Sequence, residues 1–560
     1  MWPDERHKWL QGRCAHYCLL IVTFAGLMLF NLGTASLWDV DEGNNAEAAR
    51  EMLESGDWII PTFNYELRVD KPALLYWMQL GAYRLFGIDE WSARLPSALA
   101  ALAAVLLTYE IARDMFDSCV GLVAGFALST ATSFYCFAHF ANPDTLLSAS
   151  AALTFLVFWR GLRNQAYNWF VPAGVASGLG VLAKGPIGVV LPAAVIGLVL
   201  VTTAQLSRLR DWRLLLGLLA FLVVALPWYV LVTLQTHGAF LSGFLLRHNV
   251  HRFLHPMETH SGPLYYYLIV LLFGLAPWSP FVAPALYYLV RSAIVARHGA
   301  ALDAQPRYLA CVLLCSWIAV YLVFFTFAQT KLPNYIEPLY PAVAVVLGYF
   351  LERWRQGEIS VPIWVTTLCL VCVATIGVSL MWAGWALDSE RIDLRVLNGN
   401  LYPGLWLLSL LGSIWVYGAI LAWFQLGRRP TWRFLAALGL AAILFDYGMG
   451  AWCTGLLDYY KAPRTLALAV RQQPTGSSIR AASYQYFQPS LVFYLRRKVA
   501  RLNDDADAIA FLSDSSDSCL VLPSDSWERL KPKIKGEPRV LAKHYDFTNR
   551  LVDVVLVCNR

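Results

Sequence analysis

Two polar stretches near the start of the chain contain residue types that could perform chemistry beside a membrane. WDVDEGNNAEAAREML includes the adjacent acids Asp41 and Glu42, and RVDKPALLYW includes Asp70 and Lys71. Both lie just beyond a long apolar run, where charged groups are costly to desolvate and mark functional sites. Carboxylates can orient or deprotonate an acceptor, and a lysine can bind an anion. The combination predicts a reaction site at the membrane boundary.

The acids of the first stretch also have a structural explanation. Ala46 and Ala49 recur at helical spacing, which predicts an interfacial helix lying on the membrane, and acids favour the start of a helix. For Asp39 this structural explanation is preferred. Two adjacent acids exceed what a helix start needs, so Asp41 and Glu42 are candidate catalytic residues.

Lys71, Asp144 and Lys184 are further candidates. Lys71 precedes Pro72, which favours an extended backbone before it. Its side chain could extend to lipid headgroups or bind a phosphate, and chemistry alone favours neither. Asp144 follows an Asn-Pro pair that explains a helix start, yet it would lie at the membrane level of Asp41. Lys184 lies in a tight KGPIG turn on the same side, so it is a candidate phosphate ligand.

Two later segments add cations, histidines and aromatic residues. FLLRHNVHRFLHPMETHSGPLYYY contains Arg247, His248 and His251, and AQTKLPNYIEPLYP contains Lys331 and Tyr335. The histidines indicate phosphate recognition, metal ligation or a rim of basic and aromatic groups at the membrane surface. The segment lacks the HExxH arrangement, although one histidine and a carboxylate from another loop could hold zinc.

The elements that must position these residues are membrane spans. Of 560 residues, 58% are hydrophobic and only 15% are charged, which indicates a polytopic membrane protein. A span needs about 20 mainly apolar residues, and about thirteen such runs occur. We expect them near residues 15–35, 93–112, 118–137, 145–159, 169–183, 186–203, 214–234, 264–290, 309–327, 336–351, 362–386, 404–426 and 434–455.

Lysine and arginine in the short loops predict the topology. Clusters such as Arg208, Arg210 and Arg213 all fall on one side, which the positive-inside rule assigns to the cytoplasm together with the N-terminus. The candidate reactive residues then lie on the exported side. The net charge of +6 reflects these basic loops and gives no reason to expect nucleic-acid binding. We interpret the first apolar run as a retained span and not as a cleaved signal peptide.

A small soluble domain is expected after the last span. Residues 1–455 would form the membrane domain, with outer loops at 37–92 and 235–262, and residues 456–560 an exported α/β domain. The runs SCLVL and LVDVVLV predict strands, and 464–470 and 526–530 predict helices. Only Cys519 and Cys558 of the 11 cysteines fall in this exported region, where an oxidising compartment permits a disulfide.

The distribution of charge favours an enzyme acting on the exported side. Nucleotide sugars are absent from that side, and the chain has neither a P-loop nor a GxGxxG motif, so we expect a lipid-linked donor and no nucleotide cofactor. A transporter is the competing hypothesis. It predicts ionisable residues deep inside spans, of which Asp446 is the clearest example.

Several stretches resemble a known family. DEGNNAEAAREMLESGDWIIPTFNYELRVDKPALLYW, RHNVHRF, HSGPLYYY, TKLPNYIEPLYP and SLVFYLRRKV are similar to landmarks of lipid-carrier-dependent membrane glycosyltransferases. The closest resemblance is to the ArnT-like family of 4-amino-4-deoxy-L-arabinose lipid A transferases, which is related to protein O-mannosyltransferases. It implies a GT-C type fold of α-helical spans with periplasmic interfacial helices and a C-terminal α/β domain.

The resemblance also implies a reaction and a place for it. A sugar would pass with inversion from undecaprenyl phosphate to a lipid A phosphate, among the membrane lipids of the bacterial inner membrane, at its periplasmic face. Asp41 matches the catalytic aspartate, Lys71 the lysine that binds the carrier phosphate, and Asp144 a second acid near the reaction centre. Asp70 and His251 match positions that can hold Zn²⁺.

The leaving group of the implied reaction is a lipid phosphate, and this determines the role expected for each charged residue. Lys71, aided by Arg247 or Lys331, would stabilise the departing lipid phosphate. Asp41 would orient the acceptor, and would act as a general base only for a hydroxyl acceptor. Asn44 and Asn45 stand where the family commonly has Arg-Tyr or Leu-Tyr, which leaves the sugar and the acceptor open. A protein O-glycosyltransferase, or transfer of another sugar to another envelope acceptor, therefore stays an alternative.

Overall fold

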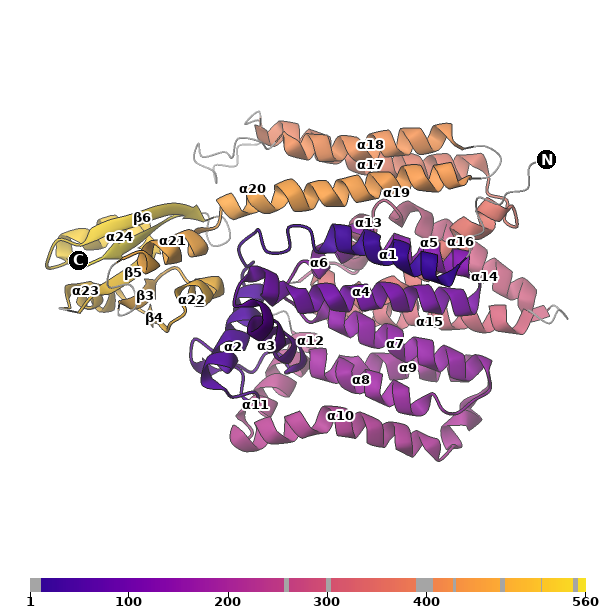
Figure 1. Cartoon of the computed structure of the whole chain (residues 1–560), viewed down its shortest axis with the longest axis horizontal. Coiled ribbons are helices and arrows are strands. Elements are labelled where there is room, and N and C mark those ends of the chain that lie inside the picture. The colour runs from indigo at the N-terminus through magenta and orange to yellow at the C-terminus, as the bar shows by residue number, and fades with distance from the viewer. Residues whose placement is uncertain are drawn as a thin grey trace.

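The computed structural model describes residues 12–255, 261–298, 304–388, 406–426, 430–473, 479–514, 516–546 and 552–559. Residues 256–260 of the expected second outer loop, 404–405 of one expected span and 551 of one expected strand lie outside this set. A bundle of long helices runs roughly parallel, and a small sheet domain sits at one end of it (Figure 1).

Apolar helices make up the bundle. Seven described helices are long and apolar enough to cross a membrane. These are α4 (Glu90–Met115), α7 (Asp144–Arg163), α10 (Arg213–Gln235), α15 (Ala304–Phe327), α17 (Ile363–Asp388), α18 (Leu407–Phe424) and α19 (Trp432–Gly448). Exposed apolar side chains such as Val223, Trp364 and Tyr417 on α10, α17 and α18 are suited to lipid contact.

Bent and shorter helices complete the bundle. Two pairs bend by 66° and 118° and raise the number of candidate spans to nine within the described residues. They are α5 (Ser118–Ser129) with α6 (Thr132–Ala138), and α13 (Tyr266–Gly274) with α14 (Val282–His298) through η5 (Ser279–Phe281). The shorter helices are α1 (Arg13–Met28), α8 (Phe170–Lys184), α9 (Ile187–Thr202) and α16 (Tyr340–Gln356). All thirteen expected spans coincide with a helix or a bent pair, but thirteen membrane crossings stay a prediction.

The first outer loop folds into two helices with a short hairpin between them. They are α2 (Asp41–Ser55) and α3 (Leu74–Phe86), with β1 (Thr62–Phe63) and β2 (Glu66–Leu67). Ala46 and Ala49 are buried, as the helical spacing predicts. Glu47 and Arg50 on the opposite face are buried too, in an ion pair of 2.7 Å. The helix is therefore covered on both faces within the protein, and its place at the membrane surface stays a prediction.

The C-terminal domain has a five-stranded mixed sheet in the order β4-β3-β5-β7-β6. Its strands are β3 (Arg480–Tyr484), β4 (Val499–Leu502), β5 (Ser518–Pro523), β6 (Arg539–Asp546) and β7 (Val552–Cys558). Its helices are α21 (Ala462–Arg471), α22 (Pro489–Leu495), α23 (Asp505–Ser513) and α24 (Ser524–Leu530), followed by the short η9 (Lys531–Lys533). The helix α20 (Thr454–Tyr459) continues the last helix of the bundle (Figure 1). The predicted strands correspond to β5 and β7, and the predicted helices lie in α21 and α24.

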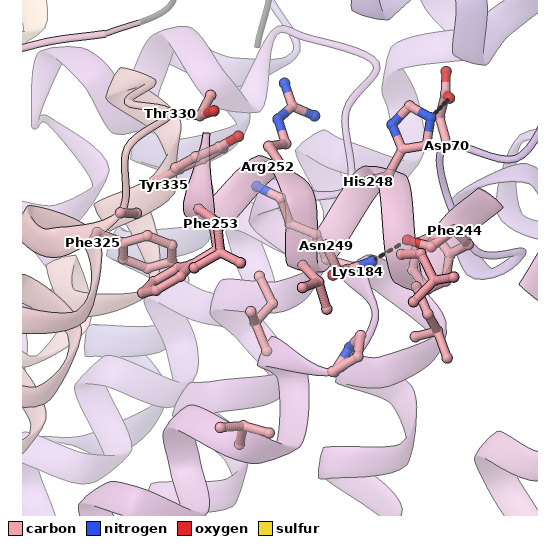
Figure 2. Close-up of a pocket in the computed structure, with 18 of the residues that line it drawn as sticks. Asp70, Lys184, Phe244, His248, Asn249, Arg252, Phe253, Phe325, Thr330 and Tyr335 are labelled. Atoms are coloured by element: carbon pink, nitrogen blue, oxygen red, sulfur yellow. Dashed lines mark hydrogen bonds and ion pairs between the residues drawn. The ribbon is translucent and has the colours of Figure 1, made fainter. Parts of the chain in front are cut away.

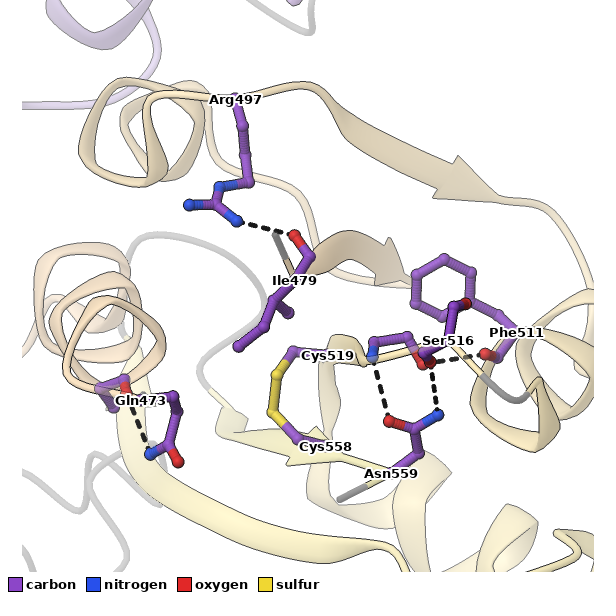
Figure 3. Close-up of a disulfide and its surroundings, with 10 residues drawn as sticks. Gln473, Ile479, Arg497, Phe511, Ser516, Cys519, Cys558 and Asn559 are labelled. Atoms are coloured by element: carbon purple, nitrogen blue, oxygen red, sulfur yellow. Dashed lines mark hydrogen bonds between the residues drawn. A yellow bond between two sulfur atoms is a disulfide. The ribbon is translucent and has the colours of Figure 1, made fainter. Parts of the chain in front are cut away.

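A disulfide joins two neighbouring strands of this sheet. Cys519 of β5 and Cys558 of β7 are directly opposite in the antiparallel register, and their side chains are bonded (Figure 3). The sequence left this pairing open because it cannot show how far apart two residues lie in space.

The sheet domain is attached to the start of α2. The backbone N–H of Ser490 in α22 donates to Asp39 (2.7 Å), and the N–H of Leu37 donates to the hydroxyl of Tyr494 (2.7 Å). Leu491 and Val492 of α22 share one apolar core with residues of α2. Asp39 thus joins two parts of the molecule, and it does not cap the helix start as the sequence suggested.

Candidate active site

A pocket of about 590 Å³ lies among the helices near Asp70 and Lys71, which precede α3 (Figure 2). Its walls come from η4 (Gly243–His251), α12 (Arg252–Leu254), the start of α9 and the segment after α15. Asp70, Lys71, Lys184 and Tyr335 line it, as do His248, Asn249 and Arg252. Four predicted residues from three separate segments thus meet in one cavity.

Asp41 lies among the cations of this pocket. Burial disfavours its charged form, but the charges of Lys71, Arg68 and Arg252 outweigh that cost, so the pKa of Asp41 lies below its ordinary value. Conversely, burial and the charges of Lys184 and Arg252 lower the pKa of Lys71, against the attraction of Asp41. The site combines these cations with Asp41, and such a cluster can bind an anion and hold an acceptor beside it.

Asp144 positions Lys184. Its Oδ1 forms an ion pair with the Lys184 ammonium, and its Oδ2 accepts a hydrogen bond from Asn334 Nδ2 (2.7 Å). The same ammonium lies 5.1 Å from the centre of the Tyr335 ring, within reach of a cation–π interaction. Both carboxylate oxygens of the buried Asp144 are already bonded. We therefore assign Asp144 a positioning role, in which it orients the side chain of Lys184.

The histidine that contacts Asp70 is His248. Its Nε2 lies 2.8 Å from Asp70 Oδ1, and Arg68 lies 3.1 Å from Oδ2 (Figure 2). Burial raises the pKa of Asp70, but the hydrogen bond from His248 and the charge of Arg68 lower it by more. The structure does not bring the predicted partner, His251, to Asp70: His251 is exposed and its ring lies 4.7 Å from that of His255.

Asp70 and His248 offer few ligands for a metal ion. The described residues contain no group of three or more His, Cys, Asp and Glu side chains that could hold one. Catalytic zinc takes about three protein ligands, and Asp70 with His248 supplies two. The residues present therefore do not fit the predicted Zn²⁺ site, and the mechanism below uses the charges of the side chains alone.

Two basic residues of the second loop reach the pocket. Gly243–His251 forms the π-helix η4, and Arg252 begins α12. His248 and Arg252 line the pocket, whereas Arg247 is exposed and does not. Asn249 lines it too, and Asn334 donates to Asp144. No local pattern in the sequence marks Arg252, Asn249 or Asn334 as site residues.

Two other predicted residues are engaged elsewhere. Lys331 donates to the carbonyls of Thr326 (2.6 Å) and Ala328 (2.8 Å), which caps the end of α15, and it does not line the pocket. Glu42 is buried in an ion pair with Arg94 (2.9 Å). Adjacent residues on a helix point about 100° apart, so Glu42 cannot share the environment of Asp41. The structure thus does not bring Lys331 or Glu42 to the site.

Comparison with known proteins gives three findings. Residues 70–230 match the family model described as dolichyl-phosphate-mannose-protein mannosyltransferase. The chain is 31% identical over 359 residues to the undecaprenyl phosphate-alpha-4-amino-4-deoxy-L-arabinose arabinosyl transferase of Pseudomonas aeruginosa (strain UCBPP-PA14), covering 61% of each chain. It is 26% identical over 483 residues to the protein of that name from Enterobacter sp. (strain 638), covering 83% of this chain and 81% of the relative.

A solved structure shares the fold. The crystal structure of ArnT from Cupriavidus metallidurans bound to undecaprenyl phosphate superposes with a TM-score of 0.78 at 22% identity, covering 99% of this chain and 98% of the other. The helical bundle and the C-terminal sheet domain therefore form one architecture across both proteins.

Proposed function

We propose that the chain, as a member of the ArnT-like family of polyprenyl-phosphate-dependent membrane glycosyltransferases, transfers 4-amino-4-deoxy-L-arabinose from undecaprenyl phosphate to a lipid A phosphate. The reaction would take place at the periplasmic face of the bacterial inner membrane, with the N-terminus in the cytoplasm. The observation that carries the proposal is a pocket lined by cations, close to Asp41 and adjoining an apolar groove.

The groove suits the tail of a lipid-linked donor. It has a volume of about 430 Å³, lies along α8 and α10, and shares Pro186 and Leu245 with the cationic pocket. Its lining is almost entirely apolar, with Phe221, Leu226 and Tyr229 among the residues. A donor phosphate placed near Lys71 could therefore leave its isoprenoid chain in the groove, where burial of each CH₂ is worth about 0.8 kcal/mol.

The geometry supports a direct displacement. An oxygen of the acceptor phosphate attacks the anomeric carbon, the bond from that carbon to the carrier phosphate breaks, and the electron pair leaves with undecaprenyl phosphate. Attack opposite the leaving group inverts the anomeric centre. Lys71, Lys184 and Arg252 would stabilise the charge that develops on the departing phosphate. Asp41 would hold the acceptor in line, because a phosphate acceptor is already ionised and needs positioning more than deprotonation.

The pH profile of the enzyme should report Lys71. Its pKa lies below that of an ordinary lysine, and the cation is lost as pH rises through that value. We expect kcat/KM to fall on the alkaline side at a lower pH than an ordinary lysine would give, and Lys71→Arg to move that limb to higher pH. Lys71→Gln should lower kcat/KM about a hundredfold at every pH. An alkaline limb that stays in place in Lys71→Arg would contradict this assignment.

Leu245 should control access of the donor tail. Leu245→Trp would fill the junction between pocket and groove. We expect KM for the undecaprenyl-linked donor to rise about tenfold, because a few methylenes of the isoprenoid chain would no longer be buried. A donor with a chain of two isoprene units should change less than twofold. Leu219→Trp, on the exposed face of α10 and outside the groove, is the matched control. Equal effects on long and short donors would exclude the groove as the tail site.

The proposed reaction can be tested on lipid A. Mass spectrometry would compare lipid A from cells with and without the protein, supplied with the undecaprenyl phosphate-linked aminoarabinose pathway. The proposal expects added aminoarabinose that depends on the protein. Unchanged lipid A in cells with abundant folded protein would exclude this acceptor and direct the search to a protein, the acceptor class named by the matching mannosyltransferase family.

A further inference from the structure

A second concavity, distinct from the transfer pocket, lies on the C-terminal domain. It has a volume of about 580 Å³ and is lined by Arg480, Arg496, Arg497 and Lys498, with Phe511 among its apolar residues. None of its described lining residues is an acid, and none lines the transfer pocket. Four cations around one hollow create a positive potential that attracts an anion.

The charges of two arginines of this concavity are disfavoured by burial and by a neighbouring cation. Burial and then the charge of Arg471, at the end of α21, lower the pKa of both Arg496 and Arg497. A lowered pKa means that the charged form of each guanidinium is disfavoured where it stands. A bound anion would stabilise the charged form of both guanidiniums, so the cluster favours anion binding.

The acids near the cluster leave it positively charged. Arg480 pairs with Asp514, and Lys498 lies 3.7 Å from Glu66, whose side chain is 76% exposed. A pair this long and this exposed is weak in water. Arg497 donates to the carbonyl of Ile479 (2.7 Å), which fixes its side chain against the start of β3 (Figure 3).

Arg496 has a backbone conformation that suits glycine. It ends α22 with φ of 55°, in the left-handed region, where a side chain costs conformational free energy and glycine is the usual residue. An arginine at such a position indicates that its side chain serves a purpose beyond ending the helix. Its Nη2 donates to the carbonyl of Ile88 (3.1 Å).

That contact places the cluster at the membrane surface. Ile88 lies between the end of α3 and the start of α4, a candidate span that begins at Glu90. Leu85 and Phe86 at the end of α3 are 77% and 55% exposed. Exposed apolar side chains next to a span, with arginines beside them, form the arrangement that inserts at the level of lipid headgroups.

We propose that this concavity binds the phosphate of a membrane lipid, held by Arg496 and Arg497. The site would dock the C-terminal domain on the bilayer surface, on the side of α3 and α22. The shared chemistry is a phosphate group, and the position beside α4 assigns it to a lipid in preference to free phosphate. The inference goes beyond sugar transfer and does not depend on it.

Calorimetric titration of the detergent-solubilised full chain tests the site. The probes are dihexanoyl phosphatidate, dihexanoyl phosphatidylcholine and inorganic phosphate, and all variants carry Lys71→Gln so that the transfer pocket contributes little. We expect phosphatidate to bind at least tenfold more tightly than either other probe. Arg496→Gly with Arg497→Gln should weaken it at least tenfold, because two charges next to the phosphate are lost. Binding should also weaken in high salt.

The controls separate folding from binding. Glycine fits the left-handed position of residue 496, so the thermal midpoint of Arg496→Gly should not fall. Lys535→Gln with Arg539→Gln removes two exposed charges at the other edge of the sheet and should change phosphatidate affinity less than twofold. Unchanged binding in the Arg496 and Arg497 variant would overturn the site. Equal affinities for phosphatidate and inorganic phosphate would overturn the lipid as its ligand.

Discussion

Asp41→Asn is expected to reduce kcat for sugar transfer by about a thousandfold while the protein stays folded. Asparagine has nearly the shape of aspartate but no charge, and Asp41 is the carboxylate around which Lys71, Arg68 and Arg252 gather. Without it the acceptor loses its positioning group, and the cations lose their counter-charge. Transfer would be measured with purified protein in lipid nanodiscs, and folding by the thermal midpoint.

Glu54→Gln is the matched control for Asp41→Asn. Glu54 lies on the same helix, is largely exposed, and pairs with Arg50 at 2.9 Å, away from the pocket. Its substitution should change kcat less than twofold. Full activity of a folded Asp41→Asn protein would remove Asp41 from the reaction.

Glu42→Leu is expected to lower the free energy of unfolding by about 3–5 kcal/mol, the cost of leaving a buried charge without its partner. Glu42 accepts hydrogen bonds from Arg94 (2.9 Å) and from the N–H groups of Trp38 (2.7 Å) and Ala141 (2.6 Å). Arg94 is buried, and leucine would leave its guanidinium without a counter-charge. Denaturation with SDS would measure the loss.

Glu42→Gln distinguishes a structural role from a catalytic one. Glutamine keeps two acceptor lone pairs and most of the geometry, so the protein should fold with lowered stability, and kcat per folded molecule should change less than threefold. A stable Glu42→Gln protein with lost activity would restore the catalytic role that the sequence predicts. The two adjacent acids of α2 should therefore give opposite results: substitution of Asp41 should lower kcat, and substitution of Glu42 should lower the free energy of unfolding.

Much of the architecture could be predicted because it follows from local patterns. Apolar runs located the helices, and the strands β5 and β7 follow from short β-branched runs in a polar tail. Asp41, Lys71, Lys184 and Tyr335 could be proposed as one site because membrane boundaries place distant loops at a common level. The predicted spans thus show which distant loops lie at the same membrane level, and the sequence of a soluble protein gives no such guide.

The remaining part of the site depends on tertiary contacts that no sequence period reveals. Arg252 lines the pocket and Arg247 does not. The pairing of Glu42 with Arg94 joins residues of two different helices, and Lys331 turns back onto a carbonyl near the end of the preceding helix, α15. Glu42 and Lys331 are thus each bound by a partner outside the expected site.

The most direct test of the account is release of undecaprenyl phosphate by the purified protein in nanodiscs containing undecaprenyl phosphate-linked aminoarabinose and lipid A. The account predicts release of undecaprenyl phosphate in a one-to-one ratio with modified lipid A. This release should be absent in Asp41→Asn and should keep its wild-type rate, within twofold, in Glu54→Gln. A folded wild-type protein that binds the donor but releases no undecaprenyl phosphate would contradict it.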